Sequence, residues 1–148
     1  SHSWPWAAIA FCRHGRCGVD VELQEHLGDW QALIPLVCHE NEQRRMAQAG
    51  RPAHQFLRLW TAKEAVSKVL GLGLSLHFPS METDMSTGSI RIDGRPAPVR
   101  FVHLANSVEE GVVSVAWAGT PEKSFCCCVS QFNVTTGCVA HVGEHHVQ

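Results

Sequence analysis

Two short stretches of this sequence carry charged side chains whose types and spacing suit chemistry at a phosphate. Asp20 and Glu22 are two residues apart in an apolar segment, so in a strand both would point to one face, about 7 Å apart. Glu64 and Lys68 are four residues apart in a helical pattern, so they share one strip of a helix. If helix and strand meet, three carboxylates converge with one ammonium. A Mg²⁺ ion would relieve their repulsion, and the metal and Lys68 together suit substitution at a pyrophosphate.

Each pattern also has a structural interpretation without chemistry. A strand with one hydrated face would hold Asp20 and Glu22 in water. Glu64 and Lys68 would then form an exposed ion pair, worth a few tenths of a kcal/mol. The packing of the helix on the acidic face of the strand distinguishes the two interpretations.

The elements that must position these residues follow from periodicity. Apolar residues recur at three- and four-residue steps from Leu59 to Val69, which predicts a helix that starts near Ala53 and ends at Gly71. A shorter helix is predicted over His39–Gln48, with Glu42 in its first turn. The predicted strands are Ala7–Cys12, Cys17–Leu23, Gly88–Ile92, Val99–Ala105, Val112–Trp117 and Ser124–Ser130. Together these elements make an α+β fold.

Composition limits the classes of function. The 148 residues fit one domain, and a formal net charge of -2 provides no general attraction to nucleic acid or an anionic membrane. No apolar run is long enough for a membrane span, and no signal peptide is visible. The seven cysteines form no CxxC pair, which argues against a zinc ribbon and favours reduced thiols in a cytoplasmic protein. Because the chain opens abruptly at Ser1-His2-Ser3 without a methionine, we expect it to be part of a longer protein.

These motifs resemble one known family. Gly18-Val19-Asp20-Val21-Glu22, then Glu42, then Trp60-Thr61-Ala62-Lys63-Glu64-Ala65-x-x-Lys68-x-x-Gly71-x-Gly73 resemble the 4′-phosphopantetheinyl transferases. Ser1-His2-Ser3 resembles the opening of the second, C-terminal lobe in the larger, surfactin-synthetase type. The resemblance implies an antiparallel sheet packed against a long helix. It covers residues 1–132, and we expect residues 133–148, with His141, His145 and His146, to form a poorly ordered tail.

The resemblance implies an activity and roles for individual residues. The reaction would be Mg²⁺-dependent transfer of 4′-phosphopantetheine from coenzyme A to a serine of an acyl or peptidyl carrier protein. Asp20, Glu22 and Glu64 would hold the metal, and Glu64 would also be the base for the serine hydroxyl. Lys68 would contact the pyrophosphate. His2 would bind a phosphate of coenzyme A, and Ser1 and Lys63 would assist.

Two departures from the family pattern leave alternatives open. Cys38 and His39 stand where the family has other residue types before the acidic residue, which weakens the transfer of a role to Glu42. The larger type has two lobes, and this chain matches only the second. The alternative is therefore a non-catalytic lobe that folds and self-associates, and we expect a homo-oligomer or pairing with a first lobe. A Mg²⁺-dependent nuclease is a weaker alternative, because there is no basic stripe for a nucleic-acid backbone.

Overall fold

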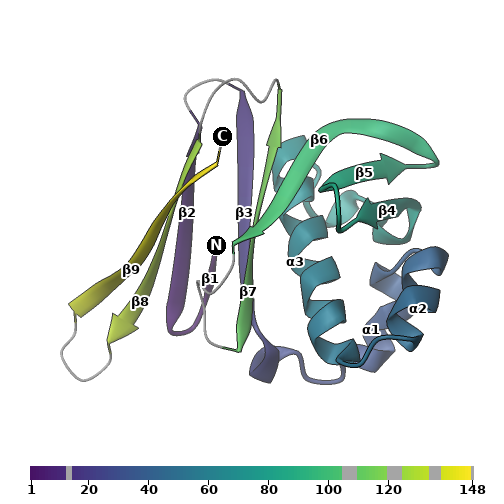
Figure 1. Cartoon of the computed structure of the whole chain (residues 1–148), viewed down its shortest axis with the longest axis horizontal. Coiled ribbons are helices and arrows are strands. Elements are labelled where there is room, and N and C mark those ends of the chain that lie inside the picture. Colours follow the sequence, from purple (N-terminus) through teal and green to yellow (C-terminus); the bar gives the residue numbers. More distant parts are fainter. Residues whose placement is uncertain (13–14, 105–109, 120–124, 134–137, 148) are drawn as a thin grey trace.

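The computed structural model describes residues 1–12, 15–104, 110–119, 125–133 and 138–147, the last two ranges by their backbone. The elements form three layers, with two antiparallel sheets face to face and the helices on the far side of the second sheet (Figure 1). The first sheet has the order β1-β2-β8-β9 and the second the order β3-β7-β6-β5-β4. The α+β prediction, with antiparallel sheets and a long helix, is therefore confirmed.

The strands of the first sheet come from the two ends of the chain. They are β1 (His2–Ser3), β2 (Trp6–Cys12), β8 (Phe125–Asn133) and β9 (Cys138–Val147). The sequence predicts a poorly ordered tail over residues 133–148, whereas in the structure Cys138–Val147 pairs along β8. The segment mixes histidine, glycine and glutamate irregularly among valines, so its apolar residues show no clear period to predict a strand.

The second sheet holds the acidic strand at one edge. Its strands are β3 (Arg16–Leu23), β4 (Met81–Asp84), β5 (Ser89–Ile92), β6 (Arg95–Leu104) and β7 (Gly111–Ala118). β3 pairs with β7, and Asp20 lies opposite Ser114. The face with Val19, Val21 and Leu23 packs on Trp6 and Ala8 of the first sheet. Every second residue of each strand thus contributes to the core between the two sheets.

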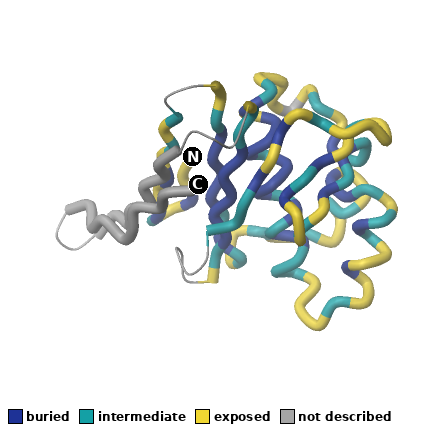
Figure 2. Tube along the Cα trace, turned by 45° about the horizontal axis from the view of Figure 1, so that its top comes forward, coloured by how far each residue is buried: buried dark blue, intermediate teal, exposed yellow. Residues whose placement is uncertain are grey.

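The helical layer covers the other face of the second sheet. It contains α1 (Trp30–Val37), α2 (Glu40–Ala47) and α3 (Pro52–Leu70), with short 3-10 turns at Gln24–His26, Gly73–Ser75 and Phe78–Ser80. α3 ends at Gly71, whose φ of 72° is left-handed, as the sequence predicts. Figure 2 shows that the buried residues gather where the second sheet lies between the first sheet and α3. None of the helices in the described part of the chain is long and apolar enough to cross a membrane.

The close approach of α3 to β3 depends on one glycine. A Cβ atom placed on Gly18 would lie 2.3 Å from the carbonyl oxygen of Ala65 and 2.9 Å from the Cβ of Lys68. Only a residue without a side chain allows the helix backbone so near the strand. The helix therefore packs on the acidic face of β3, and the interpretation of that face as hydrated is wrong.

Candidate active site

Asp20 and Lys68 form the centre of the candidate site, where α3 crosses β3. The Asp20 side chain is 5% exposed. Its Oδ1 accepts hydrogen bonds from Lys68 Nζ at 2.7 Å and from Ser1 Oγ at 2.8 Å. Lys68 Nζ also donates to the carbonyl oxygen of Val19 at 2.9 Å. The ammonium is thus fixed on one side of the carboxylate, while the side chain of Lys68 stays partly accessible to solvent.

Glu22 lies further along the same face of β3 and has its own polar partners. Its Oε2 accepts a hydrogen bond from Ser3 Oγ at 2.9 Å. The same hydroxyl lies 3.0 Å from Nδ1 of His26. Ser3 and His26 were not among the predicted site residues. The signal that could have identified Ser3 was its place in the Ser1-His2-Ser3 motif, whereas His26 carried none.

Glu64 projects from α3 toward the same group of charges. Burial raises the pKa of the Glu64 carboxyl first, and the negative charge of Asp20 raises it further. The pKa of Glu22 is raised mainly by burial too, against the hydrogen bond from Ser3, which lowers it. Lys68 lowers the pKa of both glutamates. The three carboxylates and the ammonium therefore act on one another electrostatically, as the sequence predicts for a helix packed on the strand.

One observation indicates that the carboxylate oxygens of this site suit a hard cation. Asp20 Oδ2 is buried and has no hydrogen-bond partner within the described residues. A buried carboxylate oxygen without a donor is costly and favours a bound cation. In the described ranges no three His, Cys, Asp or Glu side chains are gathered as closely as a metal site built only from protein ligands would require. Mg²⁺ commonly uses one or two carboxylates and completes its shell with water and phosphate oxygens.

The structure does not bring Lys63 to this site. Its ammonium is 0% exposed and donates to Glu42 Oε2 at 2.6 Å and to three backbone carbonyl oxygens. Those acceptors belong to Val37, Phe78 and Met81, at 2.7, 3.0 and 2.8 Å. Adjacent residues on a helix point about 100° apart. The structure therefore gives no support to the predicted contact of Lys63 with coenzyme A, because the side chain is fully buried and its ammonium is surrounded by acceptors from the protein.

Glu42 is the counter-charge in this buried cluster. Its Oε1 accepts from the backbone N and the Oγ1 of Thr83 at 2.8 and 2.7 Å, and its Oε2 also accepts from His39 N at 2.8 Å. The last bond completes a capping box at the start of α2, with His39 in the place usually taken by Ser or Thr. Glu42 thus supports the fold that carries the site and does not face it.

The two remaining predicted residues lie on or beside β1. His2 is exposed and pairs through its backbone with Ala7. The hydroxyl of Ser1 binds Asp20, so Ser1 is part of the site. Opposite Asp20 on the neighbouring strand β7, Ser114 Oγ donates to Thr61 Oγ1 at 2.7 Å and lies 2.9 Å from Nδ1 of His103, which joins α3 to β7 and β6. Burial lowers the pKa of His103 to about 3, so its imidazole is neutral near neutral pH.

Comparison with known protein families decides the relationship of this chain. The family model described as the 4′-phosphopantetheinyl transferase superfamily matches residues 16–129, from the start of β3 into β8. The chain belongs to this superfamily. The match contains Asp20, Glu22, Glu64 and Lys68.

Relatives within the superfamily include 4′-phosphopantetheinyl transferase AcpT of Salmonella typhi and of Salmonella typhimurium. Each is 35% identical over 74 residues, a segment that covers 48% of this chain and 38% of the relative. The chain thus matches well under half the length of these relatives.

Solved structures give the same fold. Holo-[acyl-carrier-protein] synthase from Neisseria meningitidis superposes with a TM-score of 0.56 at 19% identity and covers 71% of this chain and 98% of its own. The enzyme from Thermotoga maritima gives 0.53 at 19% identity, with 71% and 63% covered.

Proposed function

We propose that this chain carries the catalytic residues of a 4′-phosphopantetheinyl transferase. It would move the 4′-phosphopantetheine group of coenzyme A to a serine of an acyl or peptidyl carrier protein. Superfamily membership supports the reaction class. The single observation that supports a metal-assisted mechanism is the buried Oδ2 of Asp20, which has no hydrogen-bond donor among the described residues although Oδ1 of the same carboxylate binds the Lys68 ammonium.

The roles we propose follow from chemistry and position. Asp20, Glu22 and Glu64 would hold Mg²⁺ together with water and phosphate oxygens, because these carboxylates are not gathered closely enough to hold it alone. The bound metal would neutralise charge on the pyrophosphate. Lys68 is anchored by Asp20 and the carbonyl of Val19, so its remaining ammonium donor is directed to a phosphate oxygen. Glu64 removes the proton of the acceptor serine hydroxyl. The raised pKa of its carboxyl brings it nearer to neutral pH, where a general base works best.

The coenzyme A contacts that we retain are those on β1. His2 is exposed beside the site and would bind a coenzyme A phosphate, and Ser1 would assist through its hydroxyl. We also retain the proposal that the chain corresponds to the second lobe of the larger, surfactin-synthetase type. The free thiols of Cys17 and Cys38 suit the reducing cytoplasm, where we place the reaction.

Mass spectrometry of an apo carrier protein tests this function. Incubation with the chain, coenzyme A and Mg²⁺ should add the mass of 4′-phosphopantetheine to the carrier, and Asp20→Asn and Glu64→Gln should abolish the addition. Glu40→Gln, which alters an exposed carboxylate on α2, is the matched control and should leave the addition intact. If Asp20→Asn modified the carrier as fast as the unaltered chain, the metal role of Asp20 would be wrong.

A second candidate function, a lobe that self-associates, is favoured by the surface of the first sheet. Ile9 and Phe11 on β2 are 56% and 62% exposed, and Trp4 nearby is 55% exposed. Adjacent exposed apolar side chains of this size mark surfaces that associate. Trp60 of α3 packs against Phe56 and Phe78, so the face of the helix that carries it is partly covered.

Sedimentation velocity separates the two candidates. We expect the 148-residue chain to sediment as a homo-oligomer at micromolar concentration, and Ile9→Ser with Phe11→Ser to shift it to a monomer. An oligomer without coenzyme A binding or carrier modification would support the non-catalytic alternative. A monomer that modifies the carrier would remove self-association as a requirement.

A further inference from the structure

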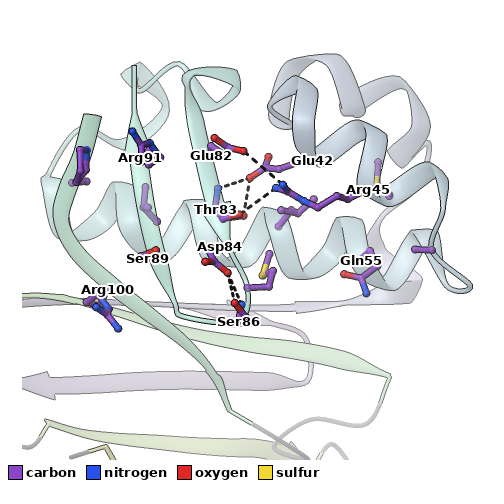
Figure 3. A pocket seen from close by; sticks show the side chains of 17 residues that line it. Glu42, Arg45, Gln55, Glu82, Thr83, Asp84, Ser86, Ser89, Arg91 and Arg100 are labelled. Atoms are coloured by element: carbon purple, nitrogen blue, oxygen red, sulfur yellow. Dashed lines mark hydrogen bonds and ion pairs between the residues drawn. The ribbon is translucent and has the colours of Figure 1, made fainter. Parts of the chain in front are cut away.

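A large cavity lies away from the acidic site, between the curled end of the second sheet and helices α2 and α3 (Figure 3). Its volume is about 790 Å³. The proposed transferase residues Asp20, Glu22, Glu64 and Lys68 do not line it, so the cavity is separate from the site already described. Such a volume accommodates a small organic ligand.

The cavity has an apolar floor. Met46 of α2, Leu59 of α3 and Ile90 of β5 are each at most 5% exposed and form its base, and Met85 and Ala97 extend it. An apolar surface of this kind binds hydrocarbon by removing it from water.

The rim of the cavity is rich in arginine. Figure 3 shows Arg91 and Arg100 on the strand side and Arg45 on the helix side. Arg91 donates through Nε and Nη2 to the carbonyl of Gly94, and Arg100 donates to the carbonyl of Thr87 at 2.9 Å. Within the part of the chain that the structure describes, neither guanidinium forms an ion pair, although Glu82 stands opposite Arg91 in the pairing of β4 with β5.

The acidic residues of the rim are already occupied. Glu82 lies 3.6 Å from Arg45 and accepts a hydrogen bond from Asn41 at 2.8 Å. Asp84 accepts from the backbone and hydroxyl of Ser86, which helps lower the pKa of its carboxyl to about 2. Because the partners of Asp84 are neutral, its negative charge stays on the rim, and Arg45, Arg91 and Arg100 exceed Glu82 and Asp84 by one positive charge.

We propose that this cavity binds an amphiphilic oxyanion, with a hydrocarbon body on the apolar floor and a carboxylate or phosphate head against Arg91 and Arg100. Guanidinium groups match both heads, because each presents paired oxygens to the planar donor fork. The inference concerns ligand binding alone and is independent of the transferase activity proposed above.

Isothermal titration of the chain with fatty carboxylates below their micelle-forming concentrations tests the proposal. Decanoate should bind with saturation at one site, and the affinity should rise from hexanoate to octanoate to decanoate by up to about fourfold per buried CH₂. Arg91→Gln and Arg100→Gln should each weaken decanoate binding by up to about fivefold, the range expected for an exposed charged contact. Decyl phosphate, titrated in parallel, identifies the preferred head group by its higher affinity.

The matched control is Arg95→Gln, which removes an exposed arginine of β6 that does not line the cavity. It should bind decanoate as the unaltered chain does. Equal losses in Arg95→Gln and Arg91→Gln would show only a general charge effect and overturn the site. Binding that is unchanged by both cavity arginines, or no saturable binding of either amphiphile, would overturn it as well.

Discussion

Replacement of Lys63 by methionine tests whether this residue of the family motif serves the fold. Methionine has a similar length but no charge, so it leaves the Glu42 carboxylate buried without its ammonium partner. Both side chains have 0% exposure, which excludes solvent screening of the loss. The three carbonyl oxygens that Lys63 Nζ now contacts would also lose their donor.

The expected cost is large compared with the stability of a domain. Breaking a buried ion pair by removal of one partner costs about 3–5 kcal/mol. A domain of ordinary stability has about 5–15 kcal/mol in total. With a urea dependence of about 2 kcal/mol per molar, the unfolding midpoint of Lys63→Met should fall by about 2 M.

Equilibrium urea unfolding followed by tryptophan fluorescence measures this shift. Arg44→Met is the control, because the Arg44 and Glu40 pair is exposed and its loss should cost about 0.5 kcal/mol or less. In the double variant Glu42→Met with Lys63→Met, the loss should be smaller than the sum of the two single losses. A Lys63→Met chain that is as stable as the unaltered chain but binds coenzyme A more weakly would refute this reasoning and restore the role implied by the motif.

Three further predictions concern packing and pH. Gly18→Ala places a Cβ against the Ala65 carbonyl and should destabilise the chain by about 1–3 kcal/mol in urea unfolding, whereas an unchanged midpoint would show that α3 is not held so close. Burial raises the pKa of Glu64 in the folded state, so stability falls as pH rises from the unfolded pKa through the folded pKa. Glu64→Gln should therefore be more stable than the unaltered chain at pH 8, and this gain should shrink toward pH 4. Urea midpoints at the two pH values measure the trend, and an equal gain at both would contradict it. The pKa of His103 is lowered to about 3, so the unfolded state binds more protons between pH 3 and the ordinary pKa of 6.5. The free energy of unfolding should therefore fall by up to about 1.4 kcal/mol per pH unit as pH drops through this range. His103→Gln should lose less stability over the same range, and parallel losses in both chains would contradict the assignment.

Sequence patterns predicted the contact between β3 and α3 because local and global signals agree there. Alternation set the faces of β3, and the four-residue step set the strip of Glu64 and Lys68. The observed bond from Lys68 to Asp20 follows from those two periods once the helix lies on the strand. The glycine at position 18 was visible in the motif, but its need became clear only from the position of the Ala65 carbonyl.

The errors arise where a residue's role depends on distant backbone. The motif does not reveal that carbonyls from Val37, Phe78 and Met81 converge on Lys63. β4 was missed because Met81–Asp84 is short and follows directly on a 3-10 turn, so no period can develop. β9 was missed because its pairing with β8 is specified by the partner strand more than by its own apolar pattern.

The pairing of β3 with β7 has a consequence for the order of folding. Asp20 lies on an early strand and pairs with Ser114, on a strand near the other end of the chain. A contact between such distant segments requires closure of a long loop, which slows folding. During synthesis, β3 and α3 emerge long before β7, so β3 is made before the strand with which it pairs. A ribosome-bound chain that ends before Gly111 should therefore keep β3 without its neighbour in the second sheet, and the site should assemble only after β7 has been made.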